Sequence, residues 1–303
     1  MKNNLFIFLA SALLAVSAEA KKPNVFACTP EWASLTLEIA GDKVNIFTAT
    51  TAQQDPHLAT ARPSLIAQMR KADLLVCSGG GLEEGWLPTL QKNAGGPSVQ
   101  EHGEHAIMAT KYVKMIEIPK KIDRSLGDLH PEGNPHVHLN PHNLLPVADV
   151  ILKRLSALAP EHKTFFEERH QKFSSKLKSQ IKIWAKQAEP LKGMRVISNE
   201  MNMSYMYEWL GIVYAGTLQP LPGLPPTLQR LSQLVEVAKA QRVALIEYAP
   251  FESPKSAQWL SSKTGIPHVE LPFTVGGGGT EDLWQLFEKT IQILLSKGEG
   301  GGK

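Results

Sequence analysis

Residues 160–190 of the chain read PEHKTFFEERHQKFSSKLKSQIKIWAKQAEP, with no glycine or further proline between the two terminal prolines. Large apolar side chains recur at the spacing of one helix face, at Phe166, Phe173, Leu177, Ile181, Trp184 and Ala188. Proline is tolerated at a helix end and disrupts a helix interior, so the prolines bracket this helix. Its roughly 29 residues would span about 43 Å, more than a small domain is wide. We therefore expect one rigid helix running along two lobes.

On both sides of this helix, short apolar segments alternate with amphipathic ones. The expected strands are residues 25–28, 44–48, 74–77 and, more weakly, 113–118 before it, and 195–198, 243–247 and 268–271 after it. The expected helices are residues 30–40 and 63–71 before it, and 202–210, 226–240, 254–263 and 281–296 after it. Such alternation predicts an α/β fold with two lobes, each a parallel β-sheet flanked by helices.

The predicted organisation has five parts. They are a signal peptide at 1–20, an N-terminal α/β lobe at 21–159, the connecting helix at 160–190, a C-terminal α/β lobe at 191–297 and a flexible Gly-rich tail at 298–303. The signal peptide is indicated by Lys2, an apolar run over residues 5–16 and the small residues Ala18 and Ala20 before the expected cleavage point. The run is shorter than the about 20 residues of a membrane span. No cysteine stands directly after this run at a lipoprotein cleavage site, so we expect a Sec-exported periplasmic protein rather than a lipoprotein.

Composition excludes several classes of protein. Of 303 residues, 43% are hydrophobic and 20% charged, and the net charge is only +3. These values rule out a disordered, collagen-like or polytopic membrane chain. No dense Lys/Arg stripe is present, so we expect no nucleic-acid partner.

The two cysteines end two of the predicted buried strands. Cys28 ends the run from Val25, and Cys77 ends the run from Leu74. If those strands are neighbours in a parallel sheet, their ends lie close enough for a disulfide. An oxidising compartment favours that bond. The alternative is a pair of buried free thiols.

Side chains that can bind metals gather in three places. They are Asp55-Pro56-His57, the loop from Gly133 to His142, and Asn199-Glu200. The first and third follow predicted strands, where ligand sites occur in open α/β sheets. A proline precedes both His57 and His136, and it restricts the local backbone. That restriction lowers the entropy lost when an imidazole is held by a metal.

Several motifs carry a family resemblance that covers nearly all of 24–296. They are Asp55-Pro56-His57, Arg62-Pro63-Ser64, residues 72–76, Gly81-Leu82-Glu83, Trp86-Leu87, residues 133–141, the long helix, Asn199-Glu200 with Tyr205 and Gly211, and Ile246-Glu247 with Phe251 and residues 253–256. In this order they resemble the zinc- and manganese-specific solute-binding proteins of ABC metal importers. The resemblance implies His57, His136 and Glu200 as metal ligands.

The chain departs from that family at the fourth ligand. The family commonly has an aspartate after the last strand, whereas this chain has Val275, which cannot ligate. Water, a bidentate Glu200 or Glu247 could complete the site, although we favour for Glu247 a role in supporting the ligands or in lobe packing. His138 is a further candidate ligand. For His138 and its neighbours His130 and His142 we favour hydrogen-bonded loop positions.

The implied function is capture of a divalent metal, Zn²⁺ first and Mn²⁺ second, as the bound solute. Two imidazoles favour zinc, while a carboxylate shifts the preference towards manganese. The implied partners are an inner-membrane ABC permease and its ATPase, and we expect a monomer. One alternative is a zinc-dependent hydrolase with a His₂Glu site. We do not expect an enzyme, because no His-Glu-x-x-His spacing occurs. Another alternative is a non-metal binder or adhesin on the same scaffold.

Overall fold

The computed structural model describes residues 21–94, 96–100, 102–120, 130–219 and 224–298. The predicted signal peptide and nearly all of the predicted Gly-rich tail lie outside these ranges. Within them, no helix is both long enough and apolar enough to cross a membrane.

The N-terminal lobe is built on a four-stranded parallel sheet. Its strands are β1 Asn24–Ala27, β2 Asn45–Thr48, β3 Leu74–Cys77 and β4 Ala106–Met108, in the order β2-β1-β3-β4. Its helices are α1 Pro30–Ala40, α2 Pro63–Met69, α3 Leu87–Ala94 and α4 Leu144–Leu158. The central strand β3 is buried along its whole length, as expected for a parallel strand covered on both faces.

The C-terminal lobe repeats this architecture. Its strands are β5 Arg195–Ser198, β6 Val213–Thr217, β7 Leu245–Tyr248 and β8 His268–Glu270, in the order β6-β5-β7-β8 and all parallel. Its helices are α6 Ser204–Leu210, α7 Leu228–Gln241, α8 Lys255–Thr264 and α9 Leu283–Gly298. The two sheets confirm the predicted fold class.

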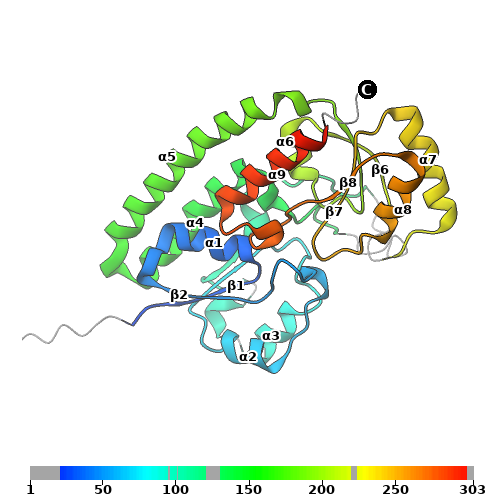
Figure 1. Cartoon of the computed structure of the whole chain (residues 1–303). Helices are drawn as coiled ribbons and strands as arrows, with labels where there is room; N and C mark the ends of the chain where they lie inside the picture. The colour runs from blue at the N-terminus through cyan, green and yellow to red at the C-terminus, as the bar shows by residue number, and fades with distance from the viewer. Residues whose placement is uncertain (1–20, 95, 101, 121–129, 220–223, 299–303) are drawn as a thin grey trace, which may run out of the picture.

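The predicted long helix is α5, Lys163–Gln187, with a short 3₁₀ helix at each end, Pro160–His162 and Glu189–Leu191. Figure 1 shows it lying diagonally along one side of the molecule, outside α4, α1 and α9. Helix α9 belongs to the C-terminal lobe but also packs against α1. There Trp284 Nε1 donates a hydrogen bond to Glu38 Oε1 at 2.7 Å. Both α5 and α9 therefore hold the lobes together.

The expected strand at 113–118 is wrong, and β4 takes the sheet edge instead. The backbone of this segment is engaged elsewhere: Ile116 N–H donates to Tyr205 Oη at 3.3 Å, and Ile116 O accepts from Asn134 N–H at 2.9 Å. Glu117 also has a φ of +56°, which is incompatible with a strand. Tertiary contacts with the C-terminal lobe have overridden the local β-propensity. Helices α3 and α4 and strand β6 were not expected from the sequence.

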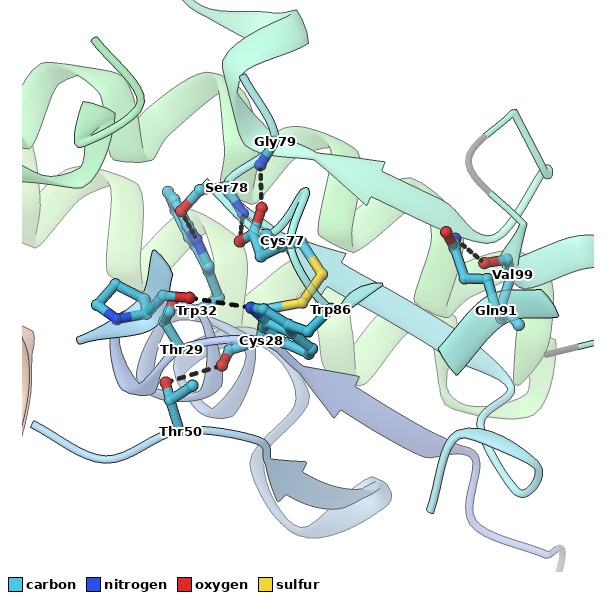
Figure 2. Close-up of a disulfide and its surroundings, with 12 residues drawn as sticks. Cys28, Thr29, Trp32, Thr50, Cys77, Ser78, Gly79, Trp86, Gln91 and Val99 are labelled. Carbon is cyan, nitrogen blue, oxygen red and sulfur yellow. Dashed lines mark hydrogen bonds between the residues drawn. A yellow bond between two sulfur atoms is a disulfide. The ribbon is translucent and has the colours of Figure 1, made fainter. Parts of the chain in front are cut away.

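The expected disulfide is present between Cys28 and Cys77, whose Cα atoms lie 4.9 Å apart (Figure 2). It forms because β1 and β3 are neighbours in the sheet. Both cysteines are buried in an apolar cluster that includes Trp86 and Phe26. The disulfide therefore cross-links the two central strands β1 and β3 at their carboxyl ends, the end of the sheet that carries the loop of His57.

Candidate metal site

His57 is oriented by its neighbour Asp55. The two residues belong to a short 3₁₀ helix, Pro56–Leu58, and its N-cap, in the loop that follows β2. Asp55 Oδ1 accepts hydrogen bonds from the His57 backbone N–H at 2.9 Å and from His57 Nδ1 at 2.8 Å. Burial raises the pKa of Asp55, but the hydrogen bond and charge of His57 outweigh it and leave that pKa below its usual value. A carboxylate on Nδ1 fixes the tautomer of an imidazole and leaves Nε2 as a ligand atom.

His136 is buried and kept neutral. Its backbone N–H donates to Asn134 Oδ1 at 3.0 Å, and its ring packs edge-on against the Phe273 ring, 4.9 Å between centroids. Burial, with the nearby imidazoles of His57, His138 and His130, holds the pKa of His136 well below its usual value. Its Nδ1 is buried without a hydrogen-bond partner. A neutral imidazole with an unsatisfied nitrogen is suited to metal binding.

A third imidazole, from His130, completes what we call the histidine cluster: His57, His130 and His136. Nε2 of His57 lies 3.1 Å from Nε2 of His130. The ring centroids are 5.1 Å apart for His57–His130, 5.5 Å for His57–His136 and 6.5 Å for His130–His136. The structure thus brings together residues 57, 130 and 136, which come from two separate loops.

Glu200 lies in the loop after β5 and is half-buried. Its charge adds to the effect of burial on Glu252, the pKa of which is raised to about 8. The ligand atoms of His57, His136 and Glu200 do not all lie within 4.8 Å of one another. Among the described residues, the one group that meets this spacing is Cys28, Cys77 and Glu83, in which the two sulfurs are already bonded to each other.

Glu247, the other candidate carboxylate, is buried inside the C-terminal lobe on β7. Burial raises its pKa to about 7, although the hydroxyls of Ser198 and Tyr207 partly offset this. Neither hydroxyl completes a hydrogen bond of good geometry. The same burial, with the charge of Glu247, raises the pKa of Tyr207 well above its usual value. These surroundings favour the supporting role expected for Glu247.

His138 and His142 lie in quite different surroundings from His130. His138 is fully buried: its Nε2 is 2.9 Å from the Phe273 carbonyl oxygen, and its Nδ1 is 3.5 Å from Glu31 Oε1. His142 is exposed and meets the ring of Trp209 edge-on. His138 therefore packs one lobe against the other, whereas His142 lies at the surface.

The loop that carries His136 is bonded to the C-terminal lobe. Tyr205 Oη donates to Asn134 O at 3.1 Å, and Asn134 Nδ2 donates to the Met201 carbonyl oxygen at 2.9 Å. Beside these bonds, Thr274 Oγ1 donates to Glu31 Oε2. The histidine cluster therefore lies next to a buried polar contact between the lobes.

The local sequence does not distinguish His130 from the other loop histidines. The signal available was its position six residues before His136, with Pro131 beside it. Which loop histidine faces His57 is decided by the fold of a loop whose contacts lie 73 residues apart in sequence. Local periodicity carries no information on such a contact.

A family model described as "ZnuA: Zinc-uptake complex component A periplasmic" matches residues 25–296. Among curated relatives, the manganese ABC transporter substrate-binding lipoprotein PsaA of Streptococcus pneumoniae is 24% identical over 282 residues, 89% of this chain and 88% of that protein. The zinc-binding lipoprotein AdcA of the same species is 25% identical over 266 residues, 86% of this chain. The chain spans only 51% of the length of AdcA.

Solved structures confirm the fold. A crystal structure of ZnuA superposes with a TM-score of 0.76 at 18% identity and covers 93% of this chain and 100% of that one. The laminin-binding adhesin Lmb of Streptococcus agalactiae gives a TM-score of 0.73 at 17% identity, covering 90% of this chain and 98% of that one. At these identities the likeness concerns the arrangement of the two lobes and the long helix.

Proposed function

Because this chain belongs to the ZnuA family of periplasmic zinc-uptake components, we propose that it is the solute-binding component of an ABC importer and captures a divalent transition metal. Zn²⁺ is the first candidate cargo and Mn²⁺ the second, since relatives named for each metal match most of the chain. The family and these relatives are substrate-binding transport components and not enzymes, which argues against the hydrolase alternative.

The observation that carries this proposal is the pairing of His57 with a buried, neutral His136. The ring centroids of these residues lie 5.5 Å apart, and His136 Nδ1 has no hydrogen-bond partner. A buried polar atom left without a partner costs about 1–3 kcal/mol. The fold tolerates that cost at a place where Asp55 also orients the second imidazole. Ligand binding is the role that such an arrangement serves.

We propose His57, His136 and Glu200 as ligands, which joins the N-terminal lobe to the C-terminal lobe through the metal. Glu200 is half-buried on a loop, so it can approach the imidazoles without disturbing β5. Coordination at about 2.0–2.2 Å from zinc would require that approach, since the three ligand atoms are more widely spaced now. Metal capture would therefore draw loops together across the lobe boundary.

The direct test is metal content and affinity of chelator-stripped protein. We expect one zinc ion per chain in the wild type and at least about tenfold weaker binding in His57→Ala, His136→Ala and Glu200→Ala. His142→Ala is the matched control, because it removes an exposed histidine from the same loop. A wild type without zinc, or three variants that bind like the control, would refute the proposal.

Competition between the two metals tests the order of cargo. We expect Zn²⁺ to displace Mn²⁺ from the loaded protein, because imidazole sites follow the general affinity order in which zinc exceeds manganese. The opposite displacement would make manganese the cargo.

The family places the protein outside the cytoplasm. We propose that residues 1–20 direct Sec export to the periplasm, and that a permease and its ATPase receive the metal from a monomeric protein. N-terminal sequencing of exported protein, with Lys21 as the expected first residue, and its mass in solution would test the leader and the oligomeric state.

A further inference from the structure

We propose that His130 is a metal ligand, so that three imidazoles and Glu200 form a four-coordinate site selective for zinc. This inference rests on the proposed function and deepens it, because it names the residue that fills the fourth position. Nothing in the family resemblance or in the relatives assigns a role to His130.

The first support is the distance between the two Nε2 atoms. A tetrahedral zinc ion with Zn–N bonds of about 2.0–2.1 Å holds its nitrogens about 3.3 Å apart. His57 Nε2 and His130 Nε2 are 3.1 Å apart, within about 0.2 Å of that spacing. The same geometry places imidazole centroids about 5 Å apart. The observed separations of 5.1 Å and 5.5 Å around His57 agree with it. His130 and His136, at 6.5 Å, would have to approach by about 1.5 Å, since the ligand atoms of the three histidines do not all lie within 4.8 Å of one another.

The second support is the orientation of the two rings. Asp55 accepts a hydrogen bond from His57 Nδ1–H, which keeps the proton on Nδ1, so His57 Nε2 presents a lone pair towards His130. Without metal, the His130 Nε2–H donates to that lone pair. When a cation binds, the proton of His130 moves from Nε2 to Nδ1, so the imidazole stays neutral and no proton is released to solvent. The Nε2 lone pairs of His57 and His130 then both face the ion.

The third support is the way the fold makes room for the His130 ring. Gly81 has a φ of +87°, and a Cβ at this position would lie 3.1 Å from His130 Nδ1. A larger residue at position 81 would therefore press on the imidazole at Nδ1, while Nε2 is the atom that faces His57. The glycine leaves the His130 ring in place against its partner.

The other residues near the fourth position are occupied or cannot ligate. Val275 is aliphatic, and the Thr274 hydroxyl donates to Glu31. His138 Nε2 is 2.9 Å from the Phe273 carbonyl oxygen, and its buried Nδ1, which has no hydrogen-bond partner, lies 3.5 Å from Glu31 Oε1, so this ring is held between Phe273 and Glu31. The fourth donor thus comes from the N-terminal lobe, and three imidazoles with one carboxylate favour zinc more strongly than two would.

The test measures zinc binding and coordination in His130→Ala, with His142→Ala as the matched control. We expect the zinc dissociation constant to rise at least about tenfold in His130→Ala and to change less than about twofold in the control. X-ray absorption of the zinc-loaded proteins should show three imidazoles in the wild type and two in His130→Ala. A residue that only positions His57 would weaken binding without changing the number of imidazoles.

Two imidazoles in the zinc-loaded wild type, or an unchanged affinity in His130→Ala, would overturn the inference. The comparison with His57→Ala separates this failure from failure of the proposed function. If His57→Ala loses zinc while His130→Ala does not, only the role of His130 is wrong. If the wild type itself binds no zinc, the proposed function fails first. Circular dichroism of each variant checks that it is folded.

Discussion

Replacing Glu247 with glutamine should stabilise the protein more at alkaline than at acidic pH. The side chain is buried in the C-terminal lobe, and burial raises its pKa to about 7 from a usual value of 4.5. The folded protein therefore favours the protonated acid, whereas the unfolded chain ionises it freely. Glutamine keeps the shape of the neutral acid and removes the charge.

The magnitude follows from linkage between protonation and folding. One pKa unit corresponds to about 1.4 kcal/mol, so a raised carboxyl pKa costs stability as pH rises from the unfolded value to above the folded value. For Glu247 the cost is about 1 kcal/mol near pH 5 and about 3 kcal/mol near pH 8. The stability of the folded protein is therefore highest below pH 4.5, the usual pKa, and falls as the pH rises through the folded-state pKa of about 7. Removing this charge also relieves Glu252, the pKa of which Glu247 helps to raise.

Urea unfolding of chelator-treated protein at both pH values measures the effect. We expect the stability difference, Glu247→Gln minus wild type, to grow by about 2–3 kcal/mol from pH 5 to pH 8. Glu236→Gln is the control, because Glu236 is exposed on α7 with Lys239 at 3.4 Å. A difference that stays constant with pH, whatever its size, would show that Glu247 ionises normally in the folded protein.

Three further outcomes are expected. Asp55→Ala should weaken zinc binding about 10–100-fold in chelator competition, because His57 loses the carboxylate that orients it; unchanged affinity would contradict this. Cys28→Ser/Cys77→Ser should lower the free energy of unfolding by about 4 kcal/mol, from a sequence separation of 49 residues; a loss below about 1 kcal/mol would contradict the entropic argument. Tyr205→Phe should cost about 1–3 kcal/mol in denaturant unfolding, because a buried carbonyl loses its donor; an unchanged midpoint would contradict it.

The long helix was predictable because its signal is local. Apolar residues at helical spacing over residues 160–190 give α5 at Lys163–Gln187, and the prolines lie within the flanking 3₁₀ helices. The disulfide was predictable for a similar reason, since Cys77 ends β3 and Cys28 directly follows β1, its neighbour in the sheet.

The edge strand and the third imidazole were not predictable from local patterns. Residues 113–118 have more β-character than β4, but contacts with Tyr205 and Asn134 hold them in an irregular path. The position of the His130 ring is set by contacts with His57 and Gly81, which are distant from it in sequence. The roles of His57, His136 and Glu200 as ligands stay predictions, although the structure brings the first two together.

The contacts between the lobes bear on how a bound metal would leave. The buried bonds of His138 to Phe273 and of Tyr205 to Asn134 cross the lobe boundary. A wide hinge opening would break both and leave buried partners unpaired, at about 1–3 kcal/mol for each group. It would also break the packing contacts that α5 and α9 make with α1. His57 and Glu200 lie half-buried on loops and take part in neither of these two hydrogen bonds, so their movement breaks neither. Release through local movement of those two loops is therefore the lower-energy route, and the lobes can stay joined while the cargo leaves.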